Sequence, residues 1–120
     1  MSLSCARVLV IEDEALVAML LEDMLQDIGC DEVELAPRFA EGMQAAENGT
    51  FDVAILDVNL DGTSSFPIAD RLIARGIPVI FATGYGAHGV DPRYAQMPTL
   101  QKPFFFDDLE RVVRQALGAA

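Results

Sequence analysis

One stretch, FDVAILDVNLDG at residues 51–62, constrains the fold more than any other part of the chain. Residues 53–56 within it form a continuous apolar run, which is typical of a strand buried on both faces of a parallel sheet. The run ends at Asp57 in a loop-like composition. Because ligands of open α/β sheets bind just outside the carboxyl ends of the strands, Asp57 stands where chemistry is expected. Taken alone, the pattern also fits an acidic loop that only ends a strand.

The rest of the chain repeats this alternation of buried strands and amphipathic helices. Further strands are predicted at residues 7–11, 32–36 and 78–83 and around Leu100. Apolar residues at helical spacing predict helices at residues 16–28, 38–47, 64–75 and 106–117. Such alternation predicts a parallel sheet with right-handed crossovers and helices on both faces.

Size and charge narrow the class of function. We expect one domain over residues 1–120, with no output domain, because 120 residues leave no region for a second one. The net charge of −11 and the scattered eight basic residues argue against nucleic-acid binding and favour a cation or a basic protein as partner. The sequence shows no membrane-spanning run, signal peptide or cysteine metal motif, so we expect a cytoplasmic protein with reduced thiols.

Acidic residues follow two of the predicted strands. Glu12 and Asp13 come directly after the first strand, as Asp57 comes after the third. If these strands pair, the carboxylates crowd together, and two of them about 5 Å apart repel by roughly 3 kcal/mol at an effective dielectric constant near 20. Mg²⁺ suits such an oxygen-rich pocket, and a carboxylate beside the ion can attack phosphorus.

A hydroxyl and an ammonium group would complete this site by binding phosphoryl oxygens. Thr83 and Lys102 stand at the ends of the fourth and fifth predicted strands, where they could do so. Thr83 is also compatible with an ordinary strand residue, and Lys102 with a solvated residue before a helix.

In these features the whole chain resembles the receiver domains of two-component response regulators. The resemblance depends on Glu12-Asp13, Asp57, Thr83 and Lys102-Pro103-Phe104, in this order at the strand ends. It is greatest for a subgroup with the motif Phe-Ala-Thr-Gly-Tyr, here residues 81–85, and with segments similar to residues 59–62 and 67–70. Regulators without an output domain are common in that subgroup, and their kinases often belong to variant histidine kinase families.

The resemblance implies a flavodoxin-like, doubly wound five-stranded sheet of order 2-1-3-4-5. It implies that Asp57 accepts a phosphoryl group from a sensor histidine kinase in a Mg²⁺-dependent reaction, and that the protein signals to a downstream protein as a monomer or weak homodimer. Asp13 would bind the metal directly, Glu12 through water and Asn59 through its backbone carbonyl. Thr83 and Lys102 would hold the phosphoryl oxygens, and Lys102-Pro103 is predicted to be a cis peptide.

One position departs from the commoner receivers, which carry an aromatic switch residue where this chain has Thr99. Tyr85, between Gly84 and Gly86, is our candidate to replace it. Residues 84–98 are rich in Gly and Pro, so we expect them to be mobile without phosphate and ordered after phosphorylation. Phe104, Phe105 and Phe106 cannot all point into one core, so at least one should be exposed.

Two other functions fit the same pattern. The first is a small Mg²⁺-dependent phosphatase or phosphotransferase, although 120 residues leave little chain to build a substrate pocket. The second is a degenerate receiver that only binds partners, which the intact acidic, Thr and Lys set disfavours. We therefore expect a phosphoacceptor signalling domain that catalyses only its own phosphorylation and dephosphorylation.

Overall fold

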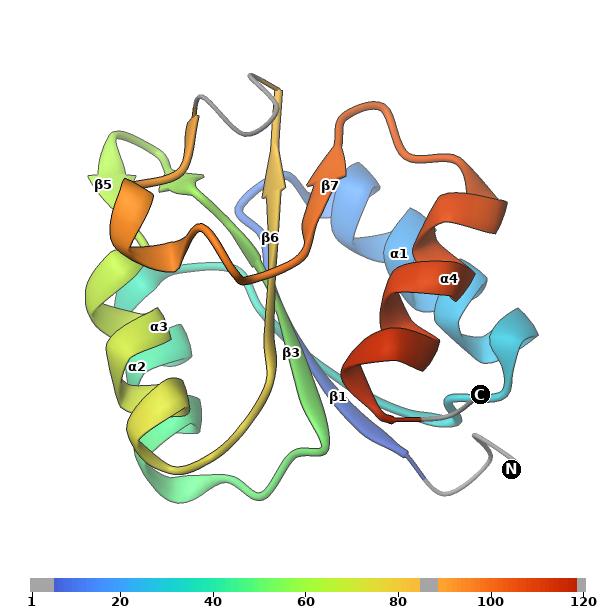
Figure 1. Cartoon of the computed structure of the whole chain (residues 1–120), viewed down its shortest axis with the longest axis horizontal. Helices are drawn as coiled ribbons and strands as arrows, with labels where there is room; N and C mark the ends of the chain where they lie inside the picture. The colour runs from blue at the N-terminus through green and yellow to red at the C-terminus, as the bar shows by residue number, and fades with distance from the viewer. Residues whose placement is uncertain (1–5, 85–88, 119–120) are drawn as a thin grey trace.

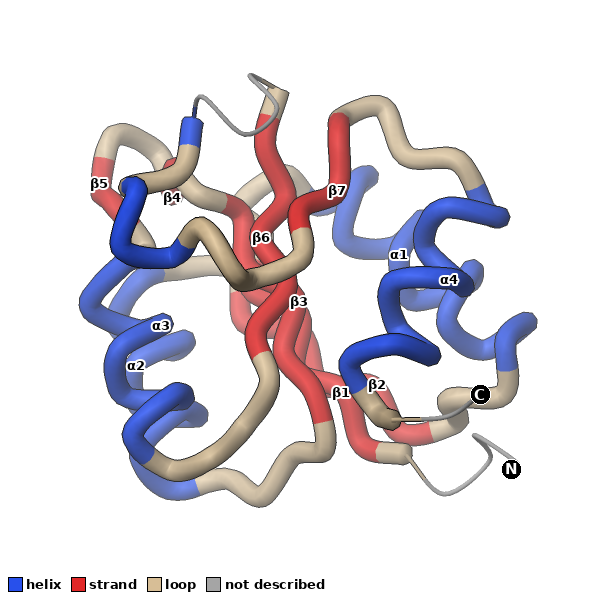
Figure 2. Tube along the Cα trace, viewed as in Figure 1, coloured by secondary structure: helices blue, strands red, loops and turns tan. Residues whose placement is uncertain are grey.

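A five-stranded parallel sheet forms the centre of the computed structural model, which describes residues 6–84 and 89–118 (Figures 1 and 2). Its strands are Arg7–Ile11 (β1), Glu32–Ala36 (β2), Val53–Asp57 (β3), Val79–Thr83 (β6) and Thr99–Gln101 (β7). Their order in the sheet is β2-β1-β3-β6-β7. This confirms the predicted order 2-1-3-4-5, because the labels β4 and β5 belong to a separate hairpin.

Two helices cover each face of the sheet (Figure 1). Ala15–Ile28 (α1) and Phe106–Ala116 (α4) lie on one face, and Phe39–Asn48 (α2) and Phe66–Ala74 (α3) lie on the other. Each helix lies within two residues of its predicted position at either end. None of the helices in the described ranges is both long and apolar enough to cross a membrane.

The apolar strands fill two cores because successive side chains of a strand point to opposite faces. In β1, Val8 and Val10 join the core beneath α1 and α4, whereas Leu9 and Ile11 join the core beneath α2 and α3. β3 and β6 divide their side chains in the same way. Burial on both faces explains why these strands read as unbroken apolar runs.

A short hairpin directly after β3 was not predicted. Asn59–Leu60 (β4) pairs with Thr63–Ser64 (β5) across a two-residue loop of Asp61 and Gly62. Both loop residues have positive φ, 50° and 86°, as the tight turn of a hairpin requires. The Asp-Gly pair is the sequence signal that could have revealed it. The hairpin fixes the path of the backbone directly after Asp57.

The connection from β6 to β7 is the irregular part of the fold. Among its described residues, Pro92–Tyr94 forms a short 3-10 helix (η2), in agreement with the weak helical pattern of this segment. Tyr85 lies outside the described residues, so the prediction that it acts as a switch stays a prediction, as does the ordering of residues 84–98.

Candidate functional site

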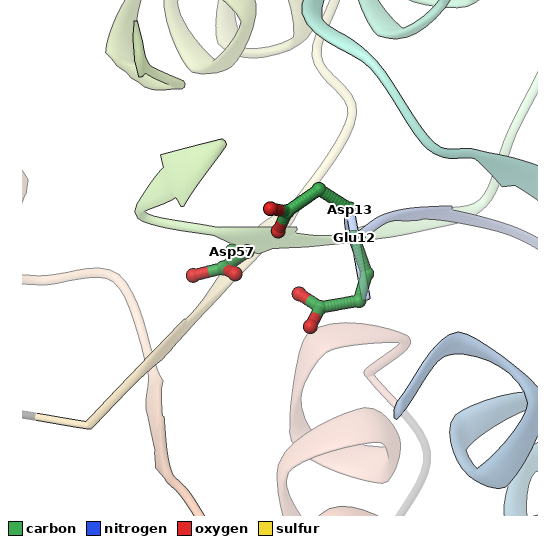
Figure 3. A group of neighbouring side chains, drawn as sticks. All are labelled: Glu12, Asp13 and Asp57. Atoms are coloured by element: carbon green, nitrogen blue, oxygen red, sulfur yellow. The ribbon is translucent and has the colours of Figure 1, made fainter. Parts of the chain in front are cut away.

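The ends of β1 and β3 bring three acidic side chains together. Ile11 pairs with Leu56, so Glu12 comes beside Asp57 at the same edge of the sheet. The carboxylate oxygens of Glu12, Asp13 and Asp57 offer one ligand atom each within 4.8 Å of one another (Figure 3). Glu12 and Asp57 are buried, whereas Asp13 is not. The predicted meeting of these residues is therefore found in the structure.

Lys102 enters this acidic group from the end of β7. Its backbone N–H donates to the carbonyl of Thr83 at 3.0 Å, which holds the residue after β7 against the end of β6. Its Nζ donates to Asp57 Oδ2 at 2.9 Å and contacts the Glu12 carboxylate oxygens at 3.2 and 3.3 Å. The predicted cis peptide between Lys102 and Pro103 is also found. The alternative interpretation, that Lys102 is only a solvated residue before a helix, is therefore wrong.

The electrostatics of the group show an excess of negative charge. Burial, followed by the hydrogen bond and charge of Asp57, raises the pKa of Glu12 to about 8. These effects outweigh the nearby ammonium of Lys102, which acts in the opposite direction. Burial alone would lower the pKa of Lys102, but its hydrogen bonds and the charges of Asp57 and Glu12 raise it. The Lys102 ammonium thus contacts two of the three acidic side chains, Glu12 and Asp57, and an added cation would relieve the repulsion among the three.

Thr83 and Asn59 complete the rim of the site. Thr83 is buried at the end of β6, one residue beyond Ala82, which pairs with Asp57. The N–H of Asn59 donates to Asp57 Oδ1 at 3.3 Å, and Asn59 Oδ1 accepts from the N–H of Gly62 at 2.8 Å. The hairpin turn therefore uses the side chain of Asn59, and the prediction that its backbone carbonyl is a metal ligand stays a prediction. The possible metal ligands of Glu12, Asp13 and Asp57 are carboxylate oxygens, which Mg²⁺ prefers.

A second polar cluster near this edge was missed by sequence reasoning. Tyr94 of η2 is buried, and its hydroxyl donates to Asp70 Oδ1 of α3 at 2.5 Å. Arg93 forms an ion pair with Asp70 at 3.1 Å, and its guanidinium lies 4.6 Å from the centre of the Tyr94 ring. The ring packs against Phe81 of β6 with centroids 5.2 Å apart. Asp70 belongs to the motif quoted at residues 67–70, but no sequence pattern links it to Tyr94.

Comparison with known proteins identifies the family of this fold and site. The family model described as response regulator receiver domain matches residues 8–114, which is most of the chain. The chain belongs to the response regulator receiver family. Receiver domains of this family are signalling domains, and phosphorylation of an aspartate with Mg²⁺ is typical of them.

Two solved structures are similar to this receiver domain along nearly their whole length. The solution structure of SdrG from Sphingomonas melonis Fr1 is 42% identical, with a TM-score of 0.84, and the match covers 99% of this chain and 100% of that one. A BeF3-activated conformation of SdrG from Pseudomonas melonis Fr1 is 40% identical, with a TM-score of 0.80 and coverage of 97% and 98%.

A curated relative of this receiver domain is longer than the chain. The transcriptional regulatory protein PdtaR of Mycobacterium tuberculosis (strain H37Rv) is 30% identical over 116 residues, which are 93% of this chain and 57% of PdtaR. This receiver domain spans about half the length of the curated relatives it matches.

Proposed function

We propose that Asp57 accepts a phosphoryl group from a phosphohistidine of a sensor kinase, and that the modified protein signals by binding a downstream protein. The observation that carries this proposal is the convergence of Glu12, Asp13, Asp57 and Lys102 at one edge of the sheet. An isolated strand-end aspartate would need neither the two other carboxylates nor the ammonium. As a group, they provide a nucleophile, oxygen ligands for a metal and a cation for the incoming oxygens.

We assign the roles of the residues by their resemblance to the site of receiver domains. Asp13 would bind Mg²⁺ directly, Glu12 would act through water, and Asp57 and the backbone carbonyl of Asn59 would be further ligands. When bound, the ion screens the negative charge of the nucleophile from the phosphoryl oxygens. Lys102 already donates to Asp57 Oδ2, so its ammonium is placed to donate to an oxygen of the attached phosphoryl group. Thr83 would donate its hydroxyl to another of these oxygens.

The transfer exchanges one bond for another. A carboxylate oxygen of Asp57 forms the new bond to phosphorus while the bond to the donor's imidazole nitrogen breaks. That nitrogen keeps the electron pair and takes up a proton. A later attack by water on the phosphorus would return Asp57 to its carboxylate form and release inorganic phosphate. The domain thus modifies its own side chain and does not turn over a separate substrate.

We also propose where the protein acts and with which class of partner. A histidine kinase draws its phosphoryl group from ATP, so we place the protein in the cytoplasm with a kinase that belongs to one of the variant families. It would work as a monomer or weak homodimer, without nucleic acid or membrane. Its net charge of −11 suits protein partners with a basic surface.

Incubation with acetyl phosphate and Mg²⁺ tests this function against the enzymatic alternative. We expect at most one phosphoryl group per chain, bound as an acyl phosphate, and no labelling when EDTA removes the metal. Repeated turnover of an added phosphate ester would instead indicate a phosphatase or phosphotransferase. No labelling under any condition would indicate a degenerate receiver that only binds partners.

A further inference from the structure

Ser65 is a buried polar residue that the site described above does not use. It directly precedes α3, and none of its surface is exposed to solvent. Serine is mostly exposed in proteins, because burying a hydroxyl costs free energy unless it is hydrogen-bonded. Apart from tyrosine and cysteine, four polar residues are buried in the described part of the chain, and the other three are Glu12, Asp57 and Thr83. Ser65 thus shares its burial with residues of the phosphoacceptor site alone.

The hydroxyl of Ser65 is not used to cap the helix that follows it. Ser65 occupies the N-cap position of α3, where a serine side chain normally accepts an N–H of the first turn, but it makes no such bond. The neighbouring Ser64 supplies an acceptor there, because its Oγ accepts from the N–H of Phe66 at 3.2 Å. The hydroxyl of Ser65 donates instead to the carbonyl of Val58 at 3.3 Å. It therefore serves the backbone directly after Asp57.

This bond closes the base of the β4–β5 hairpin. The carbonyl of Val58 also accepts the backbone N–H of Ser65 at 3.0 Å, and the carbonyl of Ser65 accepts the N–H of Ile68 at 3.0 Å. On the other side, the N–H of Val58 donates to the carbonyl of Ala82 in β6 at 3.0 Å. Ser65 thus ties the first turn of α3 to the residue that follows Asp57.

A single peptide unit connects this bond with the phosphoacceptor. The peptide between Val58 and Asn59 is trans, so the carbonyl of Val58 and the N–H of Asn59 lie in one plane and point in opposite directions. Ser65 binds the carbonyl, and the N–H donates to Asp57 Oδ1 at 3.3 Å. Lys102 donates to the other carboxylate oxygen, Oδ2. Rotation of this peptide would therefore move the donor that holds one side of the carboxylate.

From these contacts we propose that Ser65 is a positioning residue for phosphoryl transfer. Its hydroxyl fixes the orientation of the Val58–Asn59 peptide, and this peptide in turn fixes the direction in which the carboxylate of Asp57 faces the phosphorus. The inference rests on the proposed function of Asp57. Attack on phosphorus requires an aligned oxygen, so a small misplacement of the carboxylate slows transfer. The backbone N–H of Ser65 restrains the same carbonyl, so loss of the hydroxyl should loosen the peptide without releasing it.

The test removes two adjacent hydroxyl groups, one at a time. Ser65→Ala loses the bond to Val58, and Ser64→Ala, the matched control, loses the bond to Phe66. Each variant lacks one hydrogen bond at the start of α3, so a general loss of stability would affect both. Urea unfolding shows whether each is folded under the assay conditions. With acetyl phosphate and saturating Mg²⁺, we expect the labelling rate to fall about three- to tenfold in Ser65→Ala and to stay within about twofold in Ser64→Ala.

The amide proton of Asn59 gives a second readout that needs no phosphoryl transfer. A hydrogen bond to a carboxylate shifts an amide proton resonance downfield, so Asp57→Ala should move this resonance upfield. Ser65→Ala should move it in the same direction, whereas Ser64→Ala should leave it in place. Ser65→Cys keeps a side chain of similar size with a weaker donor, so its rate and its shift should lie between those of the wild-type protein and Ser65→Ala.

Labelling of Ser65→Ala at the wild-type rate would overturn the proposal, as would an equally slow Ser64→Ala, because the effect would then come from the start of α3 as a whole. A slow Ser65→Ala with an unmoved Asn59 resonance would also overturn it. If Ser65→Ala does not fold, wild-type values of both readouts in Ser65→Cys would count against the proposal. Failure of acetyl phosphate to label the wild-type chain would instead refute the proposed function of Asp57, while the Asn59 resonance would still report on Ser65.

Discussion

At the scale of single residues, Lys102 holds the acidic group of the site together. Its ammonium contacts two buried acidic side chains, those of Asp57 and Glu12. Removing one partner of a buried ion pair leaves an uncompensated charge, which costs more than the pair itself contributes. The lysine therefore stabilises the site before any phosphoryl group arrives, in addition to the role proposed for it in binding that group.

Substitution of Lys102 by methionine should lower the free energy of unfolding by roughly 2 kcal/mol in the presence of EDTA. Addition of Mg²⁺ should restore part of this loss, because the ion supplies the missing positive charge. Urea unfolding followed by circular dichroism measures both effects. Arg111→Met is the control: Arg111 forms an exposed ion pair with Asp108, so its loss should cost at most about 0.5 kcal/mol. Equal losses in the two variants would contradict this account.

At the scale of elements, η2 is held to the body of the fold by the side chains of Tyr94 and Arg93, which both contact Asp70 of α3. Tyr94 is buried among Phe66 and Phe81 and donates to Asp70, although η2 itself is a single short turn. Phe81 precedes Thr83 by two residues in β6. The Tyr94 ring thereby anchors the connection from β6 to β7 close to the site. Position 99, where the commoner receivers carry an aromatic switch residue, is Thr99 in this chain.

Burial, followed by the hydrogen bond and charge of Asp70, raises the pKa of Tyr94 to about 12. Because the folded state favours the neutral phenol, its stabilising effect is complete below the unfolded pKa of about 10. The effect is lost as the pH rises through 10 toward 12. Tyr94→Phe should cost about 1–2 kcal/mol at pH 8, and the difference from the wild-type protein should shrink at higher pH.

Urea unfolding at pH 8 and pH 11 measures that difference. The absorbance of tyrosinate, compared between wild type and Tyr94→Phe, gives the titration of Tyr94 directly. A phenol that ionises near pH 10 would contradict the buried hydrogen bond to Asp70.

Much of the fold and site was predictable because it depends on local patterns. Unbroken apolar runs identify β1, β3 and β6, and the residues directly after them must meet at one edge of a parallel sheet. Packing between distant elements leaves no such pattern. The contact of Tyr94 with Asp70 joins residues 24 positions apart, and nothing in either segment specifies the other. The hairpin at Asp61 and Gly62 did have a local signal, which the dominant β3 pattern obscured.

At the scale of the whole molecule, the net charge of −11 acts on stability and on metal binding together. Self-repulsion destabilises the folded chain, and monovalent salt screens it. A specific metal site adds a further increment that salt cannot supply. The two contributions can be separated because only the second depends on the acidic group of Glu12, Asp13 and Asp57.

We expect NaCl to raise the melting temperature of the wild-type protein and of Asp13→Asn alike. At constant ionic strength, Mg²⁺ should then stabilise the wild-type protein further, by about 2.7 kcal/mol at one hundred times its dissociation constant. Asp13→Asn should lose most of this increment. Differential scanning calorimetry measures both. An equal effect of Mg²⁺ on the two proteins would place the metal elsewhere or reduce its action to screening.

The central claim, that Asp57 is the phosphoacceptor, is tested most directly by mapping the modified residue. The wild-type protein and Asp57→Asn are treated with acetyl phosphate and Mg²⁺, reduced with borohydride to trap the acyl phosphate, and analysed by peptide mass spectrometry. The fold should hold or gain stability in Asp57→Asn, because the amide relieves like-charge repulsion with Glu12 and keeps an acceptor for Lys102. We predict a single modified residue, Asp57, in the wild-type protein and none in the variant. Labelling of Asp57→Asn at the wild-type rate, or modification of another residue in the wild-type protein, would contradict the claim.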